Sequence, residues 1–127
     1  MVYPHSVRAL VLLCLSCGGT EAIVDRPIEF GEERIQLTKE YLEQRYGLQK
    51  DTPEIEPKMI VLHWTAIPTL QKSYEAFEKS TLPNWRPDIE SVSGLNVSAH
   101  FLVDRDGTIY RLMPEKTMAR HVIGLNH

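Results

Sequence analysis

The segment Met59–Trp64, with the sequence MIVLHW, places the strongest constraint on the fold of this chain. It has the length of a strand, it is apolar except for His63, and Thr65 follows it directly. Continuous apolar runs of this length are typical of strands that are buried on both faces. The run therefore predicts a buried strand that delivers polar side chains at its carboxyl end.

A hairpin is the next element that the sequence predicts. Two segments of strand character, Ser98–Asp104 and Thr108–Met113, flank the tripeptide Arg105-Asp106-Gly107. An Asp-Gly dipeptide between such segments favours a tight turn, because glycine readily adopts the positive φ that the turn needs.

Two further stretches have helical periodicity. The first, Glu32–Tyr46, ends at Gly47, a typical helix stop, and the second is Thr69–Lys79. A long loop, Ser80–Asn96, follows and is rich in residues that break regular structure, so we expect it to form a groove wall. Helices and strands together predict an α/β fold with a mixed central sheet flanked by helices.

The first 17 residues have the features of a signal peptide. Arg8 carries a positive charge, Ala9–Leu15 form an apolar run too short to cross a bilayer, and Cys17 lies between a small residue and two glycines. We expect export to the periplasm or the outer membrane, with an acylated Cys17 as a possible membrane tether, although Cys14 departs from the usual lipoprotein pattern. A simple cleaved signal and a buried first strand are the alternatives.

Length and composition exclude several classes of protein. The 127 residues allow one domain, and a net charge of −3 argues against a nucleic-acid partner. The two cysteines, both within the first 17 residues, exclude a disulfide framework. We divide the chain into the signal peptide (residues 1–17), an acidic helical arm and linker (residues 18–58), and the main domain (residues 59–127).

Histidines are the best candidates for chemistry. His63, His100 and His121 lie at the edges of the predicted strand and hairpin segments. Because zinc hydrolases need at least three protein ligands and an open position, these three could form a zinc site from their spacing alone. The alternative is that each is a hydrogen-bonded core or rim residue. The sequence contains no GxSxG motif and no glycine-rich phosphate loop.

Three motifs follow one another in the second half of the chain. They are IVLHWTA at residues 60–66, NVSAHFLVDRDGTIY at residues 96–110, and MARH at residues 118–121 with GLNH at residues 124–127. Their order and spacing resemble the type 2 N-acetylmuramoyl-L-alanine amidases. This zinc-dependent family is related to phage lysozyme-type amidases and to peptidoglycan recognition proteins. The resemblance covers Met59–His127.

The resemblance implies roles for individual residues. His63 matches the first zinc ligand of the family, whereas His100 matches a histidine that is not usually a ligand. His121 matches a histidine of the substrate groove, and Asn126 matches the asparagine just before the strand that carries the catalytic glutamate. Four residues are therefore expected to bind substrate: His121, Asn126, Trp64 and Thr65. Ala99 departs from members that carry a tyrosine nearby, so no catalytic tyrosine is expected there.

The implied reaction is zinc-dependent hydrolysis of the amide between N-acetylmuramic acid and L-alanine in peptidoglycan. The family supplies its other ligands and its acid/base groups from sequence beyond these motifs. We therefore expect residues 59–127 to be an incomplete, C-terminally truncated amidase domain that is inactive by itself. The alternatives are a non-catalytic module that binds peptidoglycan or muropeptides, and a structural lipoprotein domain that uses the acidic helix to bind a partner.

Overall fold

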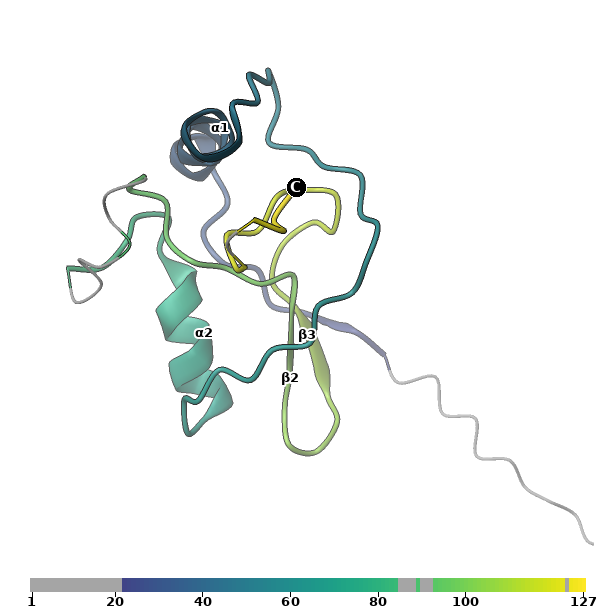
Figure 1. Cartoon of the computed structure of the whole chain (residues 1–127). Helices are drawn as coiled ribbons and strands as arrows, with labels where there is room; N and C mark the ends of the chain where they lie inside the picture. The colour runs from purple at the N-terminus through teal and green to yellow at the C-terminus, as the bar shows by residue number, and fades with distance from the viewer. Residues whose placement is uncertain (1–21, 85–88, 90–92, 123) are drawn as a thin grey trace, which may run out of the picture.

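A small mixed sheet carries two helices in the computed structural model, which describes residues 22–84, 89, 93–122 and 124–127 (Figure 1). The strands are β1 (Val24–Asp25), β2 (Phe101–Val103) and β3 (Ile109–Arg111). The sheet order is β1-β3-β2, with β3 parallel to β1 and antiparallel to β2. The predicted α/β class is confirmed. The predicted signal peptide, with both cysteines, and part of the predicted loop 80–96 lie outside the described residues.

Helix α1 (Glu32–Tyr46) has the bounds that the sequence predicts. Two acidic residues, Glu32 and Glu33, lie in its first turn, where they oppose the positive end of the helix dipole. Gly47 ends the helix in the left-handed region, at φ 67°. The buried residues of α1 recur at helical spacing and define the face that packs on the protein: Arg34, Thr38, Tyr41 and Leu42.

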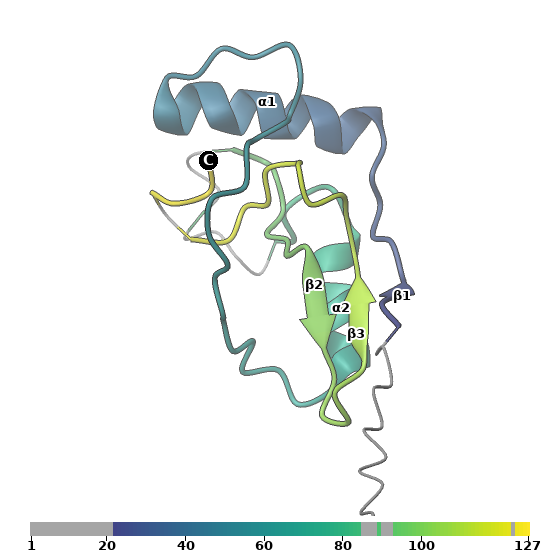
Figure 2. The ribbon, with the colours of Figure 1, turned by 90° about the vertical axis from the view of Figure 1, so that its right-hand side faces the viewer.

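Helix α2 (Leu70–Glu78) confirms the second helical prediction. Thr69 begins it as an N-cap, since its Oγ1 accepts a hydrogen bond of 3.2 Å from the backbone N–H of Lys72. Figure 2 shows α2 along one face of the sheet and α1 across one end of it.

Side chains from elsewhere in the chain satisfy the last carbonyl groups of α2. Arg34 of α1 donates to the carbonyl oxygens of Phe77 (3.0 Å) and Lys79 (2.7 Å). The side-chain amide of Asn96 donates to those of Ala76 and Lys79, both at 3.0 Å. Because the last carbonyls of a helix have no partner within the helix, these two residues supply the missing donors.

The predicted hairpin is also confirmed. Leu102 of β2 pairs with Tyr110 of β3, and the backbone N–H of Asp104 donates to the carbonyl oxygen of Thr108. Gly107 adopts φ 91°, as the Asp-Gly pattern predicts. The Asp106 carboxylate accepts a hydrogen bond of 2.9 Å from the Thr108 backbone N–H, and hydrogen bonds from Thr108 lower the pKa of Asp106.

The buried apolar side chains of the described residues form two clusters. The first lies between α2 and the sheet: Ile28, Phe77, Leu102, Leu112, Met113 and Ala119. The second lies against α1: Tyr41, Leu42, Leu95 and Met118. Full burial of one such side chain contributes about 1.5–3 kcal/mol. Both clusters contain residues from before and after position 58, so the acidic segment packs together with the domain that follows it.

The prediction of a buried strand at Met59–Trp64 is wrong. These residues belong to no strand, and their apolar side chains lie in solvent, with Ile60 91% exposed and Leu62 92% exposed. A strand requires a neighbour that supplies ladder hydrogen bonds, and β2 bonds to β3 alone among the described strands. The apolar pattern indicated burial, but no described element covers the segment.

No helix among the described residues has the length and apolar character needed to cross a membrane.

Candidate functional site

Two histidines from distant segments meet at one place on the surface. His63 lies on the exposed run 59–64, and His121 directly follows the buried run Met118–Arg120. Their ring centroids are 4.4 Å apart, and the ring planes meet at 70° in an edge-on arrangement. The structure therefore brings together two of the residues that the sequence singled out.

The pair favours an uncharged His121. Burial lowers the pKa of the half-buried His121 below its usual value, and the nearby His63 and His100 lower this pKa further. Desolvation and like charges both disfavour the imidazolium form. Both effects favour the neutral His121 ring, which offers one nitrogen as an acceptor and the other as a donor.

His100 is close enough to influence His121 electrostatically, but its ring has another partner. Its Nε2 donates a hydrogen bond of 2.7 Å to the carbonyl oxygen of Thr117, a buried residue. This contact joins the start of the hairpin to the segment that leads to His121. The arrangement fits the expectation that His100 is a hydrogen-bonded structural residue.

Trp64 and Thr65 differ in how they are held. Trp64, next to His63, is 83% exposed. The Thr65 hydroxyl shares a hydrogen bond of 3.2 Å with the hydroxyl of Ser73 on α2 and accepts one of 3.3 Å from the backbone N–H of Ile67. Ala66, between Thr65 and Ile67, has φ 58°, a left-handed conformation that costs a non-glycine residue energy. Thr65 therefore anchors a strained turn directly after His63 and Trp64.

Asn126 lies beneath the surface and is 7% exposed. Its Oδ1 accepts hydrogen bonds from the backbone N–H groups of His121 (2.9 Å) and Val122 (2.7 Å). Its Nδ2 donates to the hydroxyls of Tyr46 (3.0 Å) and Tyr41 (3.4 Å) on α1. The side-chain amide thus makes four hydrogen bonds within the protein. These bonds occupy the donors and the acceptor that a substrate would need.

Arg120, directly before His121, is a buried residue that the sequence analysis did not identify. Its guanidinium donates to the carbonyl oxygens of Ser93, Leu95 and Ile89 at 3.0, 2.5 and 2.6 Å. It also lies over the ring of Tyr41, with 4.8 Å from Cζ to the ring centroid. The sequence signal was the position of Arg120 directly after the apolar pair Met118-Ala119. A buried arginine there needs several hydrogen-bond acceptors.

Comparison with known families decides the family of this chain. A family model described as N-acetylmuramoyl-L-alanine amidase matches residues 38–127. The chain belongs to this amidase family. The match begins inside α1, before the expected start at Met59, and it includes both His63 and His121. Comparisons with curated proteins and with solved structures found no match.

The amidase family implies zinc, but the described part of this chain does not fit a complete zinc site. Among residues 22–84, 89, 93–122 and 124–127, no three histidine, cysteine or acidic side chains lie where they could hold a metal ion together. A tetrahedral zinc site requires three or four such ligands. His63 and His121 supply two imidazoles, which is short of that number.

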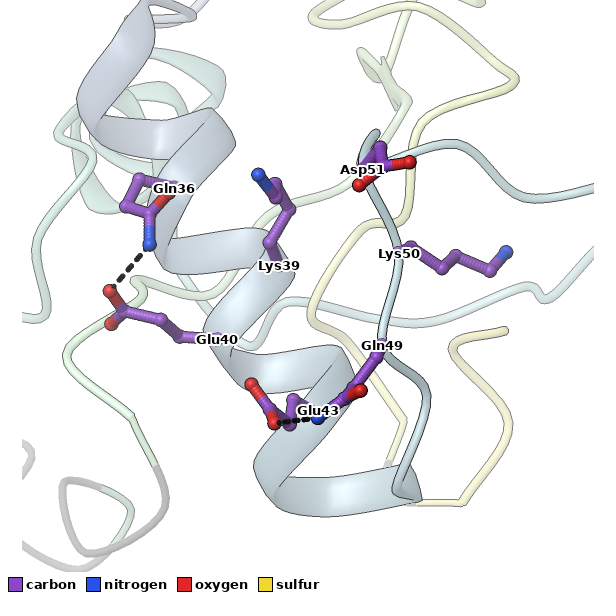
Figure 3. Close-up of a pocket in the computed structure, with 7 residues that line it drawn as sticks. All are labelled: Gln36, Lys39, Glu40, Glu43, Gln49, Lys50 and Asp51. Carbon is purple, nitrogen blue, oxygen red and sulfur yellow. Dashed lines mark hydrogen bonds between the residues drawn. The ribbon is translucent and has the colours of Figure 1, made fainter.

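Two hollows on the described part of the surface are lined by residues other than the histidine pair. One, of about 510 Å³, lies between the solvent side of α1 and the segment after it (Figure 3), and it is lined by Gln36, Lys39, Glu40, Glu43, Gln49, Lys50 and Asp51. Another, of about 330 Å³, lies beside β1 and β3, between Asp25 and Glu115. Neither is lined by His63 or His121.

Proposed function

We propose that this chain acts on peptidoglycan and that its reaction is hydrolysis of the amide between N-acetylmuramic acid and the L-alanine of the stem peptide. The family match over residues 38–127 supports this substrate class. The observation that carries the proposal is the contact between His63 and His121, which come from two separate family motifs and lie 4.4 Å apart.

Zinc dependence is the finer part of the proposal, with His63 as one ligand. The described residues contribute two imidazoles at this place, so the remaining ligands would have to come from other residues. Histidine at an exposed position is suited to this role, because a neutral imidazole nitrogen is a common zinc ligand.

The neighbouring side chains are suited to binding a muropeptide. The exposed Trp64 offers a flat apolar ring with a polar N–H group, a combination that is common where proteins bind partly apolar ligands. A neutral His121 can donate a hydrogen bond to an amide carbonyl or accept one from an amide N–H. Both residues lie beside His63, where the scissile amide would be bound.

The test is cleavage of a defined muropeptide, followed by mass spectrometry of the released sugar and peptide. The wild-type chain is assayed with added zinc and again after chelation, beside His63→Ala and, as a matched control, His127→Ala. If other residues complete the zinc site, the expected result is zinc-dependent release that His63→Ala abolishes and His127→Ala retains; with the two described imidazoles alone, the wild-type chain should release no product. Release by His63→Ala at the wild-type rate would contradict the assignment of His63.

A second candidate function is muropeptide binding without cleavage. The observation that favours it is the lack of a three-ligand group among the described residues, combined with the exposed Trp64 beside the histidine pair. Calorimetry with a muropeptide in the presence of a chelator tests it. Binding that Trp64→Ala weakens, with no product in the cleavage assay, would favour this function over hydrolysis.

Export and a lipid tether complete the proposal. The sequence of residues 1–17 supports a signal peptide with Cys17 as the acylated residue. Labelling of expressing cells with a radioactive fatty acid should mark the wild-type protein and leave Cys17→Ser unlabelled. Equal labelling of both proteins would exclude Cys17 as the tether.

A further inference from the structure

Every polar group of the buried Asn126 side chain has a partner within the protein. Its Oδ1 lies 2.9 Å from the backbone nitrogen of His121 and 2.7 Å from that of Val122. One acceptor atom thus fixes two successive N–H groups. The two residues are held at the point where the chain turns, since Leu125 N–H donates to the Val122 carbonyl oxygen and Gly124 adopts φ 88°.

The other half of the same amide connects this turn to α1. Nδ2 donates to the hydroxyls of Tyr46 and Tyr41, and Tyr41 is 2% exposed. These two tyrosines belong to a helix more than 70 residues earlier in the sequence. The backbone of His121 is therefore tied to a rigid element through a single side chain.

The residue before His121 is fixed independently. The carbonyl oxygen of Arg120 accepts a hydrogen bond of 2.9 Å from the Ser98 N–H, and its buried guanidinium binds three further carbonyl groups. Arg120 and Asn126 thus restrain the backbone on the two sides of His121. The imidazole that projects between them is the one that contacts His63.

We propose that Asn126 is a positioning residue of the candidate site. It holds the backbone of His121 and Val122 so that the His121 ring lies against His63, and it does this from beneath the surface without touching the substrate. This inference rests on the proposed function, because it takes the His63–His121 pair as the place where the muropeptide binds.

The chemistry of the amide explains why asparagine suits this place. Two N–H groups need an acceptor, and the amide provides one while it donates to two hydroxyls. Aspartate would keep the acceptor, and the tyrosine hydroxyls could rotate to donate to the carboxylate. Leucine has a similar volume but removes every hydrogen bond, and it leaves the two N–H groups without an acceptor.

The experiment compares the wild-type full chain with Asn126→Leu and Asn126→Asp by NMR. Amide hydrogen exchange at His121 and Val122 reports the two hydrogen bonds, and ring-to-ring NOEs between His63 and His121 report the pair. The affinity for a defined muropeptide, measured by titration without zinc, reports the site. The Leu112 amide, which donates to the His100 carbonyl oxygen, is the internal control.

We expect Asn126→Leu to speed exchange at both amides roughly ten-fold or more, to remove the ring-to-ring NOEs and to weaken muropeptide binding about ten-fold, with the Leu112 amide unchanged. Asn126→Asp should restore all three readouts near neutral pH. If Asn126→Leu does not fold, Tyr46→Phe provides a milder test, because it removes one hydroxyl acceptor and should change the same readouts in the same direction.

Two results would overturn the inference. Faster exchange at His121 and Val122 with unchanged NOEs and unchanged binding would show that Asn126 stabilises the turn without setting the pair. Unchanged exchange would show that the hydrogen bonds are not needed. If the NOEs are lost as expected but the wild-type chain binds no muropeptide, the positioning of His121 stands and the proposed function fails.

Discussion

Buried polar side chains hold this protein together at the level of single residues. Arg34, Asn96, Arg120 and Asn126 are each at most 7% exposed. The first three bond to backbone groups of distant segments, and Asn126 bonds to two nearby backbone N–H groups and to two tyrosine hydroxyls of α1. Buried polar groups are tolerated when they are hydrogen-bonded and are costly when they are not. Replacing one of these side chains with an apolar one should therefore lower the free energy of unfolding, because its buried partners would lose their hydrogen bonds.

Arg34 provides a direct test of this view. It is 1% exposed, and burial lowers its pKa to about 10, which still leaves it charged at neutral pH. Arg34→Leu removes the donors to the Phe77 and Lys79 carbonyl groups and should lower the free energy of unfolding by about 3 kcal/mol. Urea denaturation measures the loss. Arg34→Lys keeps the positive charge but lacks the planar guanidinium group that donates to several carbonyl groups at once. It should recover only part of the lost free energy of unfolding.

His121 should make stability depend on pH in the mildly acidic range. Its pKa in the folded protein lies below its usual value of 6.5, so the unfolded chain binds the proton more readily. The contribution of His121 to stability is therefore present above pH 6.5 and is lost as the pH falls through the folded pKa. Urea midpoints of the zinc-free protein between pH 7.5 and 5.5 should fall more steeply for wild type than for His121→Gln. Parallel curves would contradict the lowered pKa.

At the scale of elements, the start of α2 depends on one side chain. Thr69→Ala removes the N-cap hydrogen bond to the Lys72 N–H and should lower the free energy of unfolding by about 1 kcal/mol. Thr69→Ser keeps the hydroxyl and should stay close to wild type. Thermal unfolding followed by circular dichroism measures both. Equal melting temperatures for all three proteins would show that the cap contributes nothing.

Elements with local signals could be predicted from the sequence. The bounds of α1, its glycine stop, the helix after Thr69 and the Asp-Gly hairpin depend on residues a few positions apart. Strand β1 could not be predicted, because its two residues pair with β3, more than 80 positions later. The error at Met59–Trp64 has the same origin, since an apolar pattern does not specify the neighbour that a strand requires.

The candidate site was predictable only in part, for the same physical reason. The motifs singled out His63 and His121, and the structure brings these two together. The supports beneath them, Arg120 and Asn126, act through backbone groups and through tyrosines of α1. Nothing in the spacing of the sequence predicts such partners, because they are set by packing between distant segments.

At the scale of the molecule, the exposed run 59–64 is the longest exposed apolar segment among the described residues and is expected to favour self-association. An extended apolar segment whose backbone lacks a strand partner is a template for pairing with another chain. Leu62→Lys should reduce self-association, seen in a concentration series by light scattering. It should change the free energy of unfolding by less than about 0.5 kcal/mol, because Leu62 is 92% exposed.

The matched control is Leu112→Lys, since Leu112 is fully buried in the first apolar cluster. A lysine there would lack a partner for its charge, and the protein should not fold. Destabilisation by Leu62→Lys as severe as that by Leu112→Lys would mean that residues 59–64 are covered in solution.

The ties from Asn126 to Tyr41 and Tyr46 also bear on the order of folding. They join positions 85 and 80 residues apart, and contacts across such long loops form slowly because much chain entropy is lost first. Helix α1 and the hairpin, which need only neighbouring residues, should form early. The histidine pair depends on these ties, so its ring-to-ring contact should appear late in refolding, after α1 and the hairpin have formed.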